Sequence, residues 1–174
     1  MRKIIFTFLL LIVLTLAGTG EVLGQNISAT SASIKTSKSD TSFDYRVENL
    51  RKFLDRYNSP LTSYAREFVI YADENNIDYR LVPAITGVES TFGKHIPIDS
   101  FNAYGWANGE YKFTSWEDSI SHVTEVLREK YIDRGVDTIS EIARVYAPPS
   151  TTWGGKVSFF VKKIDTLPLD FDII

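Results

Sequence analysis

The chain of 174 residues contains no cysteine. It can therefore form no disulfide framework, thiolate zinc cluster or iron–sulfur centre, and it has no cysteine to act as a nucleophile or carry a lipid. A large excess of charge is also missing, because 19 Lys and Arg residues stand against 22 Asp and Glu residues, for a formal net charge of −3. A mildly acidic chain lacks the basic surface that nucleic acid requires. We therefore expect no nucleic-acid partner.

Motifs for metal and cofactor chemistry are scarce as well. His95 and His122 are the two histidines, and they lack a metal-binding spacing such as His-Glu-x-x-His. No Gly-x-Ser-x-Gly segment supports a serine hydrolase, and no glycine-rich pattern predicts a phosphate-binding loop. We expect neither a metal nor another cofactor. What the chain has in quantity is apolar sequence, since 44% of its residues are hydrophobic and 13% are aromatic.

Residues 1–24 predict an export signal. Ile4 to Ala17 is an almost unbroken hydrophobic run behind Met1-Arg2-Lys3, and small residues precede Gln25, as a cleavage site requires. As a helix the run would reach about 21 Å, which favours a signal peptide over an anchor that spans ~30 Å of hydrocarbon. Residues 25–42 are rich in Ser and Thr and predict a flexible linker. We expect a secreted, periplasmic or cell-wall-associated protein, with membrane contact only through the N-terminal segment and only if that segment is left uncleaved.

Residues 43–174 predict one domain that is mainly helical. Apolar residues recur at helical spacing between breaks rich in Pro, Gly and Asn, and a capping box begins at Thr138. The expected helices cover about 43–57, 62–75, 79–90, 114–134, 138–146 and 153–164. Asn108-Gly109 lies between aromatic-rich flanks and predicts a small β-hairpin over 101–113. The expected fold class is therefore mainly α (α+β), with about six helices and one hairpin.

Glu89 is the sharpest local anomaly. It lies near the end of an apolar helix that we expect to run through the core, just before Ser90-Thr91-Phe92-Gly93. Apolar surroundings and the negative end of a helix dipole both favour the protonated form of a carboxyl group. A carboxyl group that keeps its proton near neutral pH is what a general acid requires. The alternative is a glutamate that turns outward to water or pairs with Arg80 or Lys94.

Two segments around Glu89 resemble the motifs of a known family. Residues 88–94 (Val-Glu-Ser-Thr-Phe-Gly-Lys) and 100–106 (Ser-Phe-Asn-Ala-Tyr-Gly-Trp) are similar to the Glu-Ser-x-x-Gly and Asn-x-x-Gly motifs of bacterial cell-wall glucosaminidases. These are endo-β-N-acetylglucosaminidase-like glycoside hydrolases of the lysozyme-like superfamily, to which lytic transglycosylases are related. Residues 113–120 and 145–148 extend the likeness, although Val145 stands where the family has glycine and the transglycosylase Gly-Leu-Met-Gln signature is missing.

The resemblance implies a lysozyme-like domain with a cleft that binds peptidoglycan glycan strands, and a monomer. Glu89 would protonate the glycosidic oxygen of a β-1,4 bond between N-acetylglucosamine and N-acetylmuramic acid. The second reacting group is either a carboxylate, for which Glu110 on the expected hairpin is the candidate, or the substrate's own N-acetyl or 6-hydroxyl group. A lytic transglycosylase and an inactive glycan-binding or scaffold module are the alternatives to a hydrolase.

Other site residues follow from the same resemblance. Tyr146 corresponds to a tyrosine that orients substrate, although its spacing also suits a core aromatic. Asn102 either binds an acetamido group or organises its own loop. Trp106, beside Gly105, is the preferred residue for stacking on a sugar ring. The expected substrate-binding residues are Ser90, Asn102, Tyr104, Gly105 and Trp106.

Overall fold

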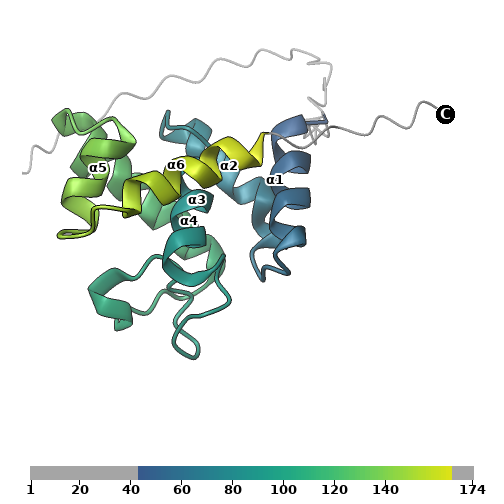
Figure 1. Ribbon diagram of the computed structural model, residues 1–174. Helices are drawn as coiled ribbons and strands as arrows, with labels where there is room; N and C mark the ends of the chain where they lie inside the picture. The colour runs from purple at the N-terminus through teal and green to yellow at the C-terminus, as the bar shows by residue number, and fades with distance from the viewer. Residues whose placement is uncertain (1–42, 166–174) are drawn as a thin grey trace, which may run out of the picture. The chain divides into compact units, whose positions relative to one another are not determined.

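The computed structural model describes residues 43–165, which fold into helices and connecting loops (Figure 1). Six α-helices are present in this part of the chain, and no strand is. They are α1 (Tyr45–Arg56), α2 (Ala65–Glu74), α3 (Leu81–Ser90), α4 (Trp116–Val126), α5 (Ile139–Tyr146) and α6 (Trp153–Ile164). The prediction of a mainly helical domain with six helices is confirmed. The signal segment predicted for 1–24, the linker predicted for 25–42 and the end of the predicted domain beyond residue 165 lie outside the described residues.

Local signals in the sequence place the helix starts. Thr138 and Glu141 form the predicted capping box of α5, in which each side chain satisfies a backbone N–H of the other residue. Ser115 caps α4 by accepting a hydrogen bond from the Asp118 backbone, and the Asp118 carboxylate binds Thr114 in return. Such caps satisfy N–H groups that have no partner within the helix.

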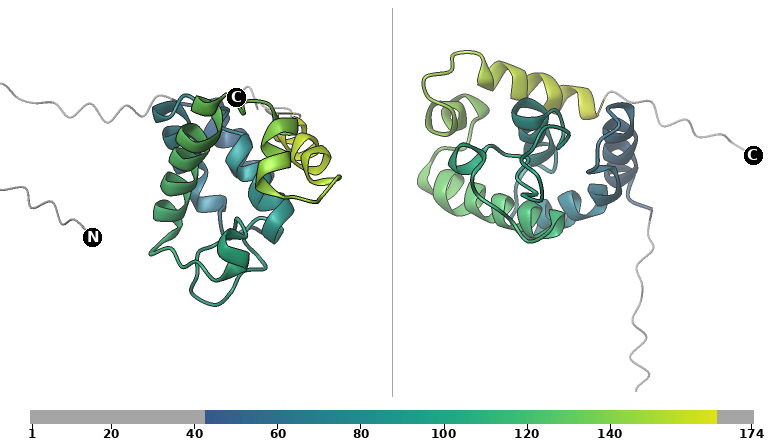
Figure 2. Two further views of the ribbon diagram at one scale, coloured as in Figure 1. Left: turned by 90° about the vertical axis from the view of Figure 1, so that its left-hand side faces the viewer. Right: turned by 90° about the horizontal axis from the view of Figure 1, so that it is seen from below.

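Helix α3 lies in the middle of the fold. Its residues from Leu81 to Gly87 are all buried, as their uniformly apolar character predicts. Helix α6 extends from α5 past α3 toward α1, and α3 also contacts α4 (Figure 2). No helix within residues 43–165 is both long enough and apolar enough to cross a membrane.

A tight reversal follows α3. Positive φ angles of 54°, 59° and 80° occur at Thr91, Phe92 and Gly93. The C-cap of α3 is therefore Thr91, whereas the sequence suggests Gly93. The Phe92 ring is fully buried and packs on Phe53 and Phe160. A Cβ at Gly87 would lie 2.5 Å from the Phe92 ring, so that close approach requires glycine. Burial of the phenylalanine offsets the strained backbone.

The predicted β-hairpin over 101–113 is wrong. This segment forms loops around a kinked turn, η2 (Trp106–Gly109), in which Ala107 and Asn108 have positive φ angles, and the loops project from the helices in Figure 1. The reason is Asn102, whose buried side chain bonds the backbone of Trp106 and Tyr111 and so replaces a ladder between strands. Asn108 has a positive φ angle, as the predicted turn requires, but it lies within η2 and does not connect two strands. The described fold is therefore all-helical and not α+β.

Candidate active site

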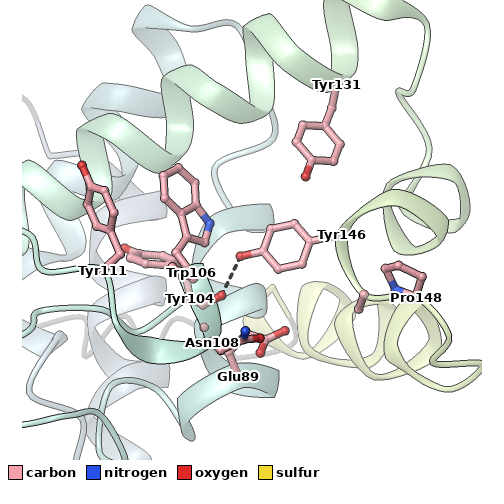
Figure 3. Close-up of a pocket in the computed structure, with 11 residues that line it drawn as sticks. Glu89, Tyr104, Trp106, Asn108, Tyr111, Tyr131, Tyr146 and Pro148 are labelled. Atoms are coloured by element: carbon pink, nitrogen blue, oxygen red, sulfur yellow. Dashed lines mark hydrogen bonds between the residues drawn. The ribbon is translucent and has the colours of Figure 1, made fainter.

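A cleft of about 630 Å³ opens where the end of α3, the loop segment around η2 and the end of α5 meet (Figure 3). Of the described residues that line it, only Glu89 is charged. Five of the eleven lining residues are aromatic: Tyr104, Trp106, Tyr111, Tyr131 and Tyr146. A concave site with several aromatic residues and a single charged group suits a ligand that is uncharged and offers flat apolar faces.

Glu89 is half-buried in the last turn of α3, and its carboxylate lies at the cleft (Figure 3). Its Oε1 atom accepts a hydrogen bond of 2.6 Å from the indole Nε1 of Trp153. One alternative interpretation of the sequence pairs Glu89 with Arg80. In the structure, Arg80 instead pairs with Asp78 and Asp165. The carboxylate is thus held by a neutral donor and remains accessible from the cleft.

Gly105 lies against the other oxygen of Glu89. A Cβ at this position would lie 2.8 Å from Glu89 Oε2, and Gly105 has a φ angle of +72°. Both the contact and the backbone conformation therefore require glycine. The Asn-x-x-Gly pattern of the sequence places backbone, and no side chain, beside the carboxylate.

Asn102 and Ser90 hold this loop in place from beneath. Asn102 is 2% exposed, and its amide donates to the carbonyls of Trp106 and Tyr111 while its oxygen accepts from the Trp106 N–H. Ser90 is also buried, and its hydroxyl bonds the Ala103 carbonyl at 2.9 Å. Neither side chain lines the cleft. We had expected both to bind substrate; the structure places them as supports of the loop, because their polar atoms already have partners.

Tyr146 holds the same loop from above. Its hydroxyl donates to the Tyr104 carbonyl at 2.8 Å (Figure 3). Its ring stacks on Trp153 with 5.0 Å between the ring centroids. Burial of the ring and the neighbouring charge of Glu89 raise the pKa of the Tyr146 hydroxyl well above its ordinary value. Tyr146 therefore stays neutral and acts as a hydrogen-bond donor.

Two further predicted site residues differ in their exposure. The Tyr104 side chain is fully buried against Phe113, so this residue offers the cleft its backbone more than its ring. Burial raises the pKa of the Tyr104 hydroxyl. Trp106 is half-buried on the cleft wall, where its ring contacts Tyr111 and His122. It is thus positioned to present an indole surface to a ligand.

Glu110, the predicted second carboxylate, is exposed and does not line the cleft. The predicted hairpin would have carried it along the cleft wall, but η2 ends just before it, and its backbone N–H donates to the Ala107 carbonyl. Another carboxylate near this segment, that of Asp118, accepts hydrogen bonds from the Thr114 backbone and hydroxyl at the start of α4. Within residues 43–165, the cleft lining therefore contains one carboxylate.

Sequence reasoning missed two aromatic residues of the site. In the expected helix over 153–164, the helical spacing of Trp153 predicts a core aromatic, and only the folded chain brings it to Glu89 from a position 64 residues away. In the expected helix over 114–134, the spacing of Tyr131 likewise predicts a residue of the inner face. Helix α4 instead continues as a π-helix, η3 (Leu127–Tyr131), and Tyr131 lines the cleft facing Tyr146 (Figure 3). A π-turn of this kind leaves no recognisable pattern in the sequence.

The chain matches no model of a known protein family and no curated protein.

Proposed function

We propose that the protein is an exported enzyme that cleaves β-1,4 bonds of the peptidoglycan backbone, between N-acetylglucosamine and N-acetylmuramic acid, with Glu89 as the general acid. The observation that carries the proposal is a lone half-buried carboxylate at an aromatic cleft, with a glycine beside one of its oxygens. The motifs around Glu89 and Asn102 and the predicted export signal supply the substrate class. A lysozyme-like fold is part of the same proposal.

The chemistry requires a proton donor and a site that accepts sugar rings. Glu89 gives its proton to the glycosidic oxygen, the bond to the leaving sugar breaks, and positive charge develops at C1 of the other sugar. Trp106 and Tyr111 offer ring faces on which the apolar faces of sugars stack. Tyr146 remains neutral and does not compete as a base. The uncharged lining suits a backbone of N-acetylated sugars.

The second reacting group comes from the substrate in this proposal: its N-acetyl oxygen bonds to C1 as the glycosidic bond breaks. Water then attacks C1, the bond to the N-acetyl oxygen breaks, and the proton released from the water returns to Glu89. Two-carboxylate glycosidases place their carboxyl groups about 5–5.5 Å or ~6.5–9.5 Å apart, whereas Glu89 is the only carboxylate among the described residues of the cleft lining. The same observation favours a second candidate, a lytic transglycosylase. There, the 6-hydroxyl of the substrate attacks C1, ionised Glu89 takes up the hydroxyl proton, and a 1,6-anhydro product forms without consumption of water.

Zymography against purified peptidoglycan tests the proposal. We expect clearing by the wild-type protein and by Glu110→Gln, but none by Glu89→Gln, with circular dichroism to show that the variants are folded. Equal clearing by the wild type and Glu89→Gln, or no clearing by the wild type, would contradict it. Mass spectrometry of the products separates the two candidates, because an anhydro end is lighter than a reducing end by one water. Binding to peptidoglycan without cleavage would identify a glycan-binding module instead.

A further inference from the structure

We propose that Trp153 is a positioning residue that fixes which oxygen of Glu89 carries the proton. The assignment to Oε2 concerns protonation of the carboxyl group and follows from contacts within the chain. The use of that proton in bond cleavage rests on the function proposed above.

The hydrogen-bonding capacity of the indole determines the assignment. Trp153 Nε1 lies 2.6 Å from Glu89 Oε1, and an indole N–H can donate a hydrogen bond but cannot accept one. Oε1 must therefore act as the acceptor in both ionisation states of the carboxyl group. The carbonyl oxygen of a protonated carboxyl group is a stronger acceptor than its hydroxyl oxygen, so the indole favours Oε1 as the carbonyl oxygen and places the hydrogen of protonated Glu89 on Oε2.

Oε2 is also the oxygen that borders the loop at Gly105. A Cβ at Gly105 would lie 2.8 Å from Oε2, and its next contacts would be with other atoms of the same side chain. Gly105 itself is exposed and lines the cleft. The proton thus lies on the oxygen that glycine leaves open to a ligand, and the oxygen bound to Trp153 faces the protein.

Trp153 is held firmly enough to impose this orientation. Its side chain is 4% exposed, and its ring is stacked on Tyr146 at an interplanar angle of 24°. Its backbone N–H donates to the Ser150 hydroxyl at the start of α6. Tyr146 is in turn bonded to the Tyr104 carbonyl. The indole, the tyrosine and the loop therefore form a continuous support around the carboxyl group.

The groups that face Glu89 from neighbouring elements are few. Tyr146 of α5 carries a hydroxyl whose pKa is raised, so it stays neutral, and Trp153 of α6 cannot ionise. No other charged side chain among the described residues lines the cleft. Loss of the indole N–H therefore removes the donor that orients the carboxyl group, and no other charged side chain of the described cleft lining is positioned to replace it.

Nuclear magnetic resonance tests the contact without any activity measurement. A ¹⁵N-labelled protein has three indole N–H signals, because the chain contains three tryptophans. The Trp153 signal is identified by its loss in Trp153→Phe, and we expect its shift to follow pH in the wild type and to become insensitive to pH in Glu89→Gln. A Trp153 signal that ignores both pH and Glu89→Gln would overturn the proposal, whether or not the protein cleaves glycans.

Kinetics test the consequence for the reaction. Trp153→Phe keeps an aromatic ring against Tyr146 but removes the donor, so we expect kcat to fall by about 10- to 100-fold while KM changes by less than about threefold. Trp116→Phe is the matched control, because Trp116 packs on Phe101.

The outcomes separate this proposal from the proposed function. A wild-type rate in Trp153→Phe, or a change in KM alone, would overturn the positioning role even if the enzyme is active. A wild-type protein that cleaves no peptidoglycan would overturn the proposed function, and the nuclear magnetic resonance result would still decide whether the Trp153 indole N–H is bonded to Glu89. Equal loss of rate and of thermal stability in Trp153→Phe and Trp116→Phe would show a merely structural role and contradict the proposal.

Discussion

Gly105→Ala perturbs the candidate site at one atom, because the added Cβ would meet only Glu89 within 4 Å. The Cβ would lie 2.8 Å from Oε2, so the carboxylate would have to retreat by about 0.6 Å to reach an ordinary contact distance. The backbone adds a second cost, since Gly105 has a φ angle of +72°. A residue with a side chain in that conformation costs roughly 1–2 kcal/mol.

Gly135→Ala is a matched control for the backbone cost. Gly135 has a φ angle of +79°, but a Cβ there would meet nothing within 4 Å. We therefore expect both variants to lose about 1–2 kcal/mol of unfolding free energy, which lowers Tm by roughly 3–8 °C for a domain of this size. Gly105→Ala should in addition lower the rate of peptidoglycan cleavage by about 10- to 100-fold, because it displaces the reacting group.

The assay is release of soluble glycan fragments from purified peptidoglycan, at a temperature where calorimetry shows each variant to be folded. The reasoning predicts a large difference in rate between two variants of similar stability. An active Gly105→Ala protein would refute the role assigned to the contact with Oε2. An equally inactive Gly135→Ala protein would show that backbone strain, and not displacement of the Glu89 carboxylate, explains the loss of cleavage rate.

Three further predictions concern the surroundings of the site. Asn102→Ala should lower the unfolding free energy in urea by about 2 kcal/mol, because it removes the partner of the part-buried carbonyls of Trp106 and Tyr111; a loss below about 0.5 kcal/mol would contradict its structural role. Glu110→Gln should keep the wild-type cleavage rate, because Glu110 is exposed outside the cleft lining, and a loss as large as that of Glu89→Gln would restore it as a catalytic candidate. Burial acts to raise the pKa of Asp78, but hydrogen bonds from Arg80 lower it below 3.8. The ionised Asp78 carboxylate therefore stabilises the folded state above pH 3.8, and this stabilisation is lost as the pH falls further. The dependence of Tm on pH below pH 4 should be flatter in Asp78→Asn than in the wild type, and an unchanged dependence would contradict the assignment.

The helices were predictable because their signals are local. The capping box of Thr138 and Glu141 and the apolar run of α3 each lie within a single element, and each was confirmed. The hairpin failed because a side chain decides the path of its backbone: the bonds from Asn102 reach Tyr111 nine positions along the chain. An Asn-Gly pair predicts a turn, but it does not show whether strands or loops surround the turn.

The candidate site was predictable only around its carboxylate. Glu89 is conspicuous as a charge on an apolar helix, whereas Trp153 looks like any core aromatic until α6 is packed beside α3. The motifs predict Ser90 and Asn102 as substrate-binding residues, yet a sequence motif does not distinguish a residue that binds substrate from one that supports the loop. Burial and existing partners make that distinction here.

The most direct test of the account compares binding and turnover of one defined oligosaccharide of alternating N-acetylglucosamine and N-acetylmuramic acid. We predict that Glu89→Gln binds the oligosaccharide with a Kd within about threefold of the wild-type value, because the aromatic lining is unchanged, while its turnover falls by about 10²- to 10⁴-fold. Turnover by Glu89→Gln at the wild-type rate would contradict the assignment of Glu89 as the general acid.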